Sequence, residues 1–346
     1  MKYKAYLCSF LLTFPILGKA SAEADSLRQV QISRLQEQVN WVNPEAIRAY
    51  LDDTKSSLGD KAPVLYQKLE ELETLLPQVN RHLSEDTTRQ TIAEAEKLLA
   101  LKREIILANP LLDVDKILIA RYRLGNKARK AMGPSLGTSV ANYNSLFSSR
   151  RKGYDAEISQ LSNLRGDIQS KTIYKPEADV PISDIQLHWD ADRLLFSSLN
   201  ENRQWQIYEI NTDGTGLHQK VVVDEPDLEF CDANYLPDGK VVATCNIGYN
   251  GVPCVHGDDV VANLVSYDPE TKNIHRLTFD QDGNWAPIVI PNGRLMYTRW
   301  EYTDLTHYFS RIVMHMNPDG TENKALYGSG SYFPNSTFDM KPLSKY

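Results

Sequence analysis

Cysteine is scarce in this sequence of 346 residues, which has four, at positions 8, 231, 245 and 254. None of them belongs to a Cys-x-x-Cys-His motif, so the usual covalent attachment of a c-type haem is excluded. The chain also lacks a nucleophile elbow, a glycine-rich phosphate loop and a His-Glu-x-x-His metal motif. The sequence therefore predicts no catalytic residue and no cofactor of these common kinds.

Net positive charge and long apolar runs are missing as well. The formal net charge is −7, whereas a nucleic-acid-binding domain usually has a basic face, so we expect no nucleic-acid partner. After residue 22 no apolar run is long enough for a bilayer, so we expect no membrane span. With 42% hydrophobic and 24% charged residues, the composition is that of an ordinary globular protein.

The first 22 residues have the pattern of a signal peptide. Lys2 and Lys4 form a basic start, and an apolar stretch over 5–18 follows that is too short to span a membrane. Ala20 and Ala22 then supply a small-residue cleavage site. We expect cleavage before Glu23 and a periplasmic or extracellular location.

Residues 23–108 are predicted to form a small helical domain. Asn43 precedes Pro44 as an N-cap precedes a proline in the first helical turn. Leucines recur at helical spacing over 64–76, and a second amphipathic run follows from Ser84. Pro63, Pro77 and Pro110 are expected to interrupt these helical runs. A bundle or hairpin that covers a sheet edge accounts for this pattern.

The region 184–327 repeats one pattern three times. Each copy has short β-rich runs separated by tight turns, such as Pro237-Asp238-Gly239 and Pro291-Asn292-Gly293. Matching strands begin near Arg193, Lys240 and Arg294, 47 and then 54 residues apart. A repeat of this length with four short strands is typical of a β-propeller blade.

The fold class is therefore mainly β with an N-terminal α region: an incomplete β-propeller of four-stranded blades preceded by a small helical domain. Residues 109–346 would hold one degenerate blade, three clear blades and the start of a further blade near 331–340. The degenerate blade would use strands at 116–122, 157–161 and 171–174. Because propellers usually close with six to eight blades, the sequence indicates a truncated chain with poorly packed residues 331–346.

The loops between the second and third strands are long and differ between copies, so they are the predicted functional face. There we expect a protein partner or a small ligand. The predicted ligand-binding rim consists of Trp285, Arg299, Trp300, Tyr302 and Asp304. The alternative for the aromatic residues is packing between blades.

Two further sites are predicted on the same face. The first is a zinc site, because thiolate, imidazole and carboxylate groups are zinc ligands; its residues are Cys254, His256, Asp258 and His307. The second is an anion-binding loop within 121–152, where basic residues occur without acidic ones; it uses Lys127, Arg129, Lys130, Arg150, Arg151 and Lys152. The alternatives are a polar loop held by hydrogen bonds and a solvated basic loop.

Four stretches resemble the middle-domain family of the hydrazine synthase alpha subunit: 109–118 (NPLLDVDKIL), 251–255 (GVPCV), 277–285 (LTFDQDGNW) and 295–305 (LMYTRWEYTDL). The Pro-Asp-Gly and Asp-Gly-Thr turns also resemble TolB-type and WD40-like propeller repeats. The resemblance covers roughly residues 105–340. It implies a propeller that lies between haem-bearing domains in an enzyme joining nitric oxide-derived nitrogen and ammonia.

The chain departs from that family in its missing haem motif and its helical N-terminal part. We therefore expect this chain to share the domain of that family but not its reaction. It would then be an exported propeller that acts as a binding scaffold. One alternative is a subunit or remnant of a haem-dependent redox enzyme of the hydrazine synthase type. Another is a carbohydrate-active propeller.

Overall fold

The computed structural model describes residues 14–85, 88–124, 147, 149, 151–252, 260–301, 310–330, 333, 336–338 and 340–342. The chain divides into two compact units. The helical unit comprises residues up to Asp115 together with the short segment 163–168, and the β unit comprises 116–162 and 169–346. The boundary between the units thus follows Asp115, except that residues 163–168 belong to the helical unit.

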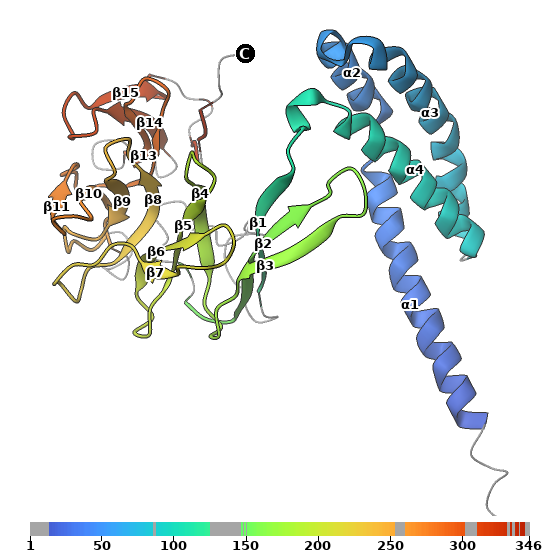
Figure 1. The fold of residues 1–346 in the computed structure, drawn as a ribbon, viewed down its shortest axis with the longest axis horizontal. Coiled ribbons are helices and arrows are strands. Elements are labelled where there is room, and N and C mark those ends of the chain that lie inside the picture. Colours follow the sequence, from blue (N-terminus) through green and yellow to red (C-terminus); the bar gives the residue numbers. More distant parts are fainter. Residues whose placement is uncertain are drawn as a thin grey trace, which may run out of the picture. The chain divides into compact units, whose positions relative to one another are not determined.

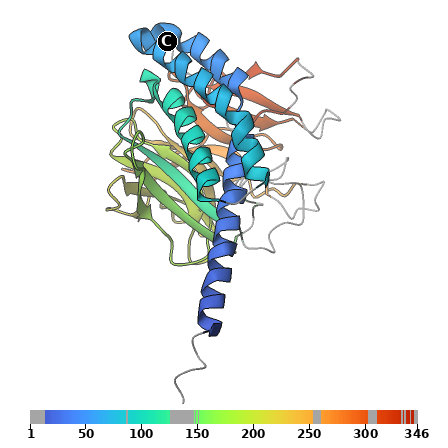
Figure 2. The ribbon, with the colours of Figure 1, turned by 90° about the vertical axis from the view of Figure 1, so that its right-hand side faces the viewer.

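The helical unit confirms the predicted N-terminal helical region. Its helices are α1 (Phe14–Asn40), α2 (Pro44–Leu58), α3 (Ala62–Glu85) and α4 (Arg89–Leu107), with short 3₁₀ turns η1 (Gly59–Lys61) and η2 (Pro110–Leu112). Asn43 caps α2 as expected, because its side-chain oxygen accepts from the amide of Ala46 at 3.1 Å. The first half of α1 extends beyond the other helices (Figures 1 and 2).

Helix α3 continues through Pro77, where the sequence pattern predicted a break. A proline inside a helix removes one backbone hydrogen bond and costs free energy. Val79 and Leu83, in the turns after Pro77, are 1% and 4% exposed and pack in the helical core. Burial of this last part of α3 offsets the local cost, so the helix ends only at Glu85.

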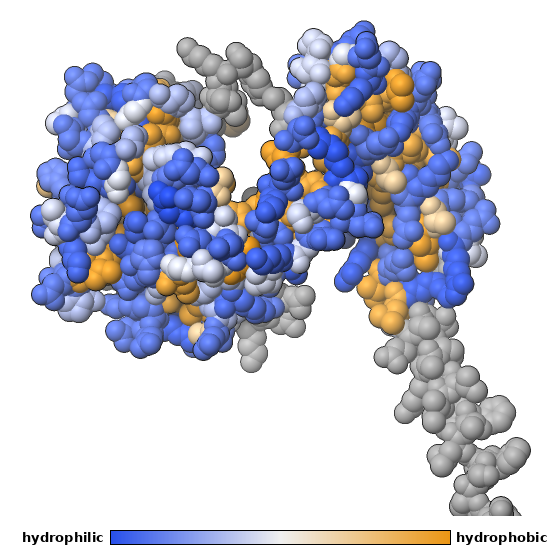
Figure 3. Space-filling model, in the orientation of Figure 1, coloured by the Kyte–Doolittle hydropathy of each residue, from blue (hydrophilic) through white to orange (hydrophobic). Residues whose placement is uncertain are grey.

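Hydrophobic side chains fill the centre of the helical bundle and also reach its surface. Leu51, Leu69, Leu72, Leu98 and Ile105 are fully buried in one cluster. Figure 3 shows further hydrophobic residues lying between hydrophilic ones on this unit. Among the described helices, none combines the length and the hydrophobicity needed to cross a bilayer.

The hairpin tip formed by residues 163–168 is held within the helical unit by two arginines. Arg103 of α4 donates through Nη2 to the carbonyl oxygens of Leu164 and Gly166, each at 2.7 Å. Arg165 donates in return to the carbonyl of Leu107 at 3.2 Å, at the last turn of α4. Because carbonyls at a helix C-terminus lack intrahelical donors, Arg165 satisfies one of them.

The described part of the β unit contains four antiparallel sheets in which each strand pairs with the next along the chain. The first sheet has three strands, as the predicted degenerate blade required, and the others have four. Their strands are, in order, β1 (Lys116–Leu124), β2 (Tyr154–Ser162), β3 (Gln169–Tyr174); β4 (Ile182–Leu187), β5 (Arg193–Leu199), β6 (Trp205–Asn211), β7 (His218–Gln219); β8 (Phe230–Tyr235), β9 (Val241–Cys245), β10 (Asn263–Tyr267), β11 (Ile274–Arg276); β12 (Asn284–Val289), β13 (Leu295–Trp300), β14 (Arg311–Met316) and β15 (Lys324–Tyr327).

Consecutive sheets pack face to face through hydrophobic clusters. Ile158 of the first sheet and Phe196 of the second share one cluster, and Ile207 of the second shares another with Phe230 of the third. Leu264 and Leu295 join the third sheet to the fourth in the same way. Stacked sheets with this up-and-down strand order have the arrangement of propeller blades (Figure 1).

The described residues contain no strand pairing between the first sheet and the fourth. Near the C-terminus, Ser336 forms an isolated parallel bridge with Arg311 of β14. This contact lies in the stretch where the sequence predicts the opening strand of a further blade. Most of residues 331–346 fall outside the described part of the chain.

The first strand of the second, third and fourth sheets carries the same irregularity. Its third residue has a positive φ: 52° at Asp184, 54° at Asp232 and 53° at Ala286. The pairing register with the next strand shifts at the same place in each sheet. This repeated β-bulge turns the third residue of each first strand away from the regular pleat.

Candidate functional site

The turn between the first and second strands departs from the repeat in the second sheet. In the third and fourth sheets this turn is Pro-Asp-Gly or Pro-Asn-Gly, and it is closed by backbone hydrogen bonds such as Leu236 to Lys240 at 2.8 Å. In the second sheet, His188 donates instead to the carbonyl of Arg193 at 2.9 Å, so the turn is one residue longer. His188 and Trp189 directly follow β4, where Leu236 and Pro237 follow β8 in the next repeat, and the extra residue of the turn comes after them.

Three aromatic rings meet at this turn. The rings of His188 and Tyr235 are perpendicular with centroids 4.7 Å apart, and Trp189 lies 4.7 Å from His188 and 6.1 Å from Tyr235. His188 and Tyr235 are buried, whereas Trp189 is 56% exposed. Since Tyr235 ends β8 of the third sheet, the exposed indole rests on a base built from two sheets.

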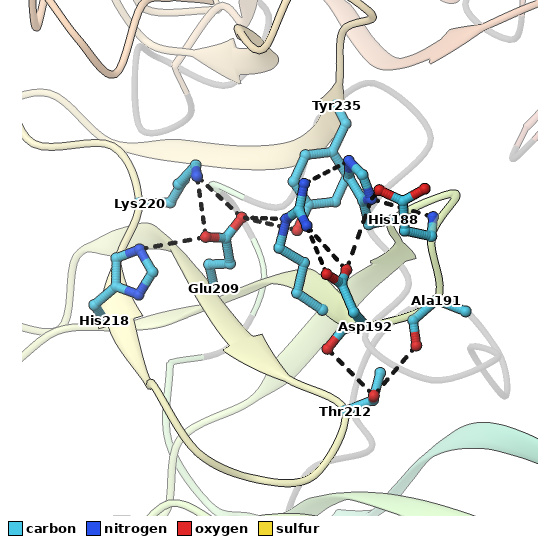
Figure 4. Close-up of polar contacts among 10 residues, drawn as sticks. His188, Ala191, Asp192, Glu209, Thr212, His218, Lys220 and Tyr235 are labelled. Carbon is cyan, nitrogen blue, oxygen red and sulfur yellow. Dashed lines mark hydrogen bonds and ion pairs between the residues drawn. The ribbon is translucent and has the colours of Figure 1, made fainter.

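Glu209 of β6 lies beneath this aromatic base and is 7% exposed. It accepts a hydrogen bond from the Tyr235 hydroxyl at 2.9 Å and pairs with Lys220 at 3.0 Å (Figure 4). The imidazole of His218 lies 3.4 Å from the same carboxylate. Burial, together with the negative charge of Glu209, raises the pKa of Tyr235, so this phenol stays protonated and donates.

Arg193 connects the carboxylates to the histidine. Its Nη1 lies 2.9 Å from both oxygens of Asp192, and its Nη2 lies 2.7 Å from Nε2 of His188. Its Nε lies 3.8 Å from Glu209, and the guanidinium is 5.7 Å from the Tyr235 ring centre. The turn is therefore held by a continuous network of charged and aromatic groups.

One part of the network has the composition of a metal site. A ring nitrogen of His188 and carboxylate oxygens of Asp190 and Asp192 lie within 4.8 Å of one another. A cation on Nδ1 would require the ring proton on Nε2, which faces the Arg193 guanidinium at 2.7 Å. Arg193 also neutralises Asp192 already, so the geometry suits a charge-balanced turn better than a metal centre.

A groove of about 580 Å³ lies beside Trp189. We call it the Trp189 groove; it is lined by Gln186, Trp189, Asn234, Pro237, Ile288, Val289, Ile290, Pro291, Gly293 and Pro342. Apart from Pro342, these residues come from the first strands β4, β8 and β12 and from the turns that follow these three strands. The groove is mostly apolar and lies where three sheets meet, as ligand sites commonly do.

A second polar feature is the pair of bulge carboxyls, Asp184 and Asp232. Asp232 Oδ2 accepts from the Thr244 hydroxyl at 3.2 Å and from the amide of Ala286 at 3.4 Å. Among the described residues, the buried Oδ2 of Asp184 has no hydrogen-bond partner. Burial, reinforced by the neighbouring Asp232 carboxylate, raises the pKa of Asp184 well above its ordinary value.

Trp285 and Trp300 of the predicted rim are 4% and 2% exposed, and both pack in a hydrophobic cluster of the β unit. Their rings therefore contact core side chains, and their predicted contact with a ligand stays a prediction. Arg299 lies between two carboxylates, with Nη2 2.9 Å from Asp280 and Nε 2.7 Å from Glu301.

In the predicted anion-binding loop, Arg151 is already engaged. Its guanidinium forms two hydrogen bonds to the Glu229 carboxylate, at 2.8 and 3.0 Å, while Lys152 is exposed. The other predicted residues lie outside the described residues: Tyr302, Asp304, Cys254, His256, Asp258, His307, Lys127, Arg129, Lys130 and Arg150. The zinc site therefore also stays a prediction.

Trp189, Tyr235 and Glu209 were not among the residues predicted from the sequence. A signal was present, since His188-Trp189 stands where the next two repeats have apolar-proline turns. Spacing along the chain could not indicate that Tyr235, from another sheet, completes the base under Trp189.

No family model and no curated protein matches the chain. Solved structures similar to it include hydrazine synthase of Kuenenia stuttgartiensis, at 14% identity and a TM-score of 0.45, covering 62% of this chain and 31% of that one. Oligogalacturonate lyase of Vibrio parahaemolyticus matches at 12% identity and a TM-score of 0.35, covering 61% and 60%. TolB of Acinetobacter baumannii matches at 13% identity and a TM-score of 0.29, covering 69% and 59%. The chain thus spans under two thirds of each of these proteins.

Proposed function

We propose that this chain is a binding scaffold whose β unit holds a partner over the Trp189 groove. Export, predicted from residues 1–22, would place this binding in the periplasm or outside the cell. The observation that carries the proposal is an indole that is 56% exposed and rests on a buried, charge-balanced base. A large exposed aromatic side chain in a fixed orientation is the usual anchor of a binding surface, because it buries much area with little loss of conformational entropy.

The surroundings of Trp189 define the chemistry of the partner. Proline and isoleucine side chains line the groove together with the indole. Such walls accept a flat apolar group, so the partner would present an aromatic or proline side chain of an extended peptide segment. An oligosaccharide is the second candidate, because the apolar face of a sugar ring also stacks on tryptophan.

The test uses the two exposed tryptophans of the chain as site and control. Trp189 is 56% exposed in the β unit and Trp41 is 76% exposed in the helical unit. A random peptide library selected on the full chain should yield binders rich in aromatic residues and proline. Their affinity should fall by at least about tenfold in Trp189→Ala and stay unchanged in Trp41→Ala.

An oligosaccharide array probed with the same variants separates the two partner classes. Binding of sugars, again lost in Trp189→Ala alone, would support the carbohydrate alternative over the peptide. Binders that tolerate Trp189→Ala, or that are lost equally in Trp41→Ala, would contradict the assignment of the site.

A further inference from the structure

The first sheet lacks the strand that begins each of the other sheets. Its turn between β2 and β3 is closed by the amide of Gly166, which donates to the carbonyl of Asn163 at 3.1 Å. In the second sheet the turn between the third and fourth strands is closed in the same way, from Gly214 to Asn211 at 2.9 Å. Strands β2 and β3 therefore correspond to third and fourth strands, and β1 to a second strand. Among the described residues, no strand takes the first position beside β1.

Strand β1 is exposed where its counterparts are buried. It forms one edge of its sheet (Figure 1). All residues of β9, the second strand of the third sheet, are buried, and so are residues 194–199 of β5 in the second sheet. In β1, by contrast, Ile117 is 39% exposed and Ala120 is exposed as well. An edge strand with exposed apolar side chains is a template on which another strand can pair.

A groove of about 740 Å³ lies at this edge, and we call it the β1 groove. It is lined by residues of both β1 and β4. In the complete sheets, neighbouring first strands lie beside one another, as β4 does beside β8 and β8 beside β12. A first strand of the first sheet would therefore contact both β1 and β4, as an occupant of the β1 groove does.

The backbone of β1 presents its hydrogen-bonding groups to the groove at alternate residues. In the second sheet, Arg193 of β5 faces the first strand, because its carbonyl accepts from the amide of His188. Leu195, two residues further, has the same orientation, and its side chain packs in the cluster shared with the third sheet. Leu118 of β1 likewise packs against the cluster shared with its next sheet. The amides of Leu118 and Ala120 therefore face the β1 groove, which both residues line.

The segment 337–342 has the opposite deficiency. The amide of Thr337 donates to the carbonyl of Arg311 at the start of β14, at 3.2 Å. Asn284, the first residue of β12, donates in the same way to Ala262, just before the third strand of the preceding sheet. Counted from Thr337, the third residue in the sequence is an aspartate, as at the bulge position of β4 and β8. The segment thus begins as a first strand, and the sheets of the described chain contain no second strand that pairs with it.

From these two complementary halves we propose that the β1 groove receives residues 337–342 of a second copy of this chain. The segment pairs antiparallel with β1, as β4 pairs with β5. Pairing completes a four-stranded sheet and covers the exposed edge, including Ile117. Each copy has one such edge and one such segment, so reciprocal exchange between two copies satisfies both and gives a closed dimer.

The experiment is sedimentation of the full chain over a wide range of concentrations. We expect a monomer that converts to a dimer as the concentration rises. A synthetic peptide with the sequence of residues 331–346 should bind the chain and dissociate the dimer, because it competes for β1. A peptide of the same composition in scrambled order is the control and should do neither.

One variant and a matched control locate the contact at the backbone of β1. Ala120→Pro removes an amide that faces the groove and should weaken both dimerisation and peptide binding by at least about tenfold. The monomer should tolerate it, because proline is accepted on an edge strand where its nitrogen faces solvent. Ala120→Ser keeps the amide and should change neither property. Circular dichroism verifies the fold of each variant, and if Ala120→Pro does not fold, the two peptides decide the question on the unmodified chain.

Three results would overturn the proposal. The first is a chain that stays monomeric at every concentration and does not bind the peptide, as expected if its own C-terminal segment covers β1. The second is equal binding of the scrambled peptide, and the third is an equal effect of Ala120→Pro and Ala120→Ser. Ala120 does not line the Trp189 groove, so none of these results bears on the binding role proposed above.

Discussion

A buried carboxylate needs partners, and Glu209 acquires them from two strands and from the residue that follows a third. It is 7% exposed, accepts from Tyr235 of β8, and pairs with Lys220 beyond β7 and with Arg193 of β5 at 3.8 Å. An uncompensated buried charge would cost several kcal/mol, so these neighbours are held in place. The orientation of Trp189 therefore depends on a residue that any partner in the Trp189 groove would never touch.

Asp184 should make stability depend on pH in the opposite direction to a normal aspartate. Its pKa in the folded state is raised, so above about pH 3.9 the unfolded state loses this proton first. The free energy of unfolding should then fall as the pH rises, until the folded-state pKa is passed. Asp184→Asn cannot ionise, so it should flatten this fall and stabilise the protein at pH 8 by about 1–3 kcal/mol.

Urea unfolding of both proteins at pH 5 and pH 8 measures this effect. Asp213→Asn serves as the control, because hydrogen bonds from Thr215 lower the pKa of Asp213 and so stabilise the folded state as the pH rises. Removing that carboxylate should reduce stability at pH 8. If Asp184→Asn reduces stability at both pH values as well, the folded protein does not hold the pKa of Asp184 above its ordinary value.

At the scale of single elements, the turns show how local sequence determines backbone shape. Gly239 and Gly293 end the predicted turns with φ of 86° and 80°, which only glycine adopts without strain. In the second sheet the equivalent residue is Ala191, with φ 56°. The network around His188 and Arg193 holds this alanine in a conformation that its own side chain disfavours.

Gly239→Ala should therefore destabilise the protein by about 1–2 kcal/mol, because the turn retains its positive φ. Gly330→Ala is the matched control, since its added Cβ would meet no neighbouring atom and its φ is not positive. Chemical denaturation of both variants measures the difference. Equal losses of stability would mean that the turn relaxes to accommodate alanine.

The bulges in β4, β8 and β12 are an element-scale feature that local sequence did not predict. The same position carries Asp184 and Asp232, whose side chains tolerate a positive φ, and Ala286, whose side chain does not favour it. Their common positive φ comes from the register shift against the second strand of each sheet. A bulge of this kind is a property of the strand pair, so a reading of one strand alone misses it.

At the scale of the whole molecule, each unit has a hydrophobic core of its own. Leu72 is fully buried in the helical cluster, and Val265 is fully buried between sheets of the β unit. Separate cores predict separate cooperative unfolding. Calorimetry should show two transitions. Leu72→Ala should reduce the free energy of unfolding of the helical unit, and Val265→Ala that of the β unit, each by about 2–5 kcal/mol.

A single transition, with a midpoint temperature that both substitutions lower equally, would contradict this prediction. Leu187→Ala provides a control, because this leucine is 47% exposed and its truncation should shift neither transition measurably.

The sequence by itself determined the elements of this protein. Leucine periodicity placed the helices, and alternation of β-branched and polar residues between Gly-containing turns placed the strands, including the three of the first sheet. These predictions succeeded because helical spacing, capping and turn chemistry act between residues a few positions apart. The prediction of a helix break at Pro77 was wrong, because burial of Val79 and Leu83 outweighed the tendency of proline to interrupt a helix.

Only the tertiary structure decided which residues meet. Trp189 and Tyr235 are 46 positions apart in the sequence (235 − 189), yet their ring centroids lie 6.1 Å apart. Asp184 and Asp232 are 48 positions apart (232 − 184), yet the charge of Asp232 raises the pKa of Asp184. Their proximity follows from the stacking of the second sheet on the third, and a strand's own sequence does not encode its distance from a neighbouring sheet. Burial then changes the chemistry of these groups, since a carboxyl in a low-dielectric interior next to another carboxylate holds its proton.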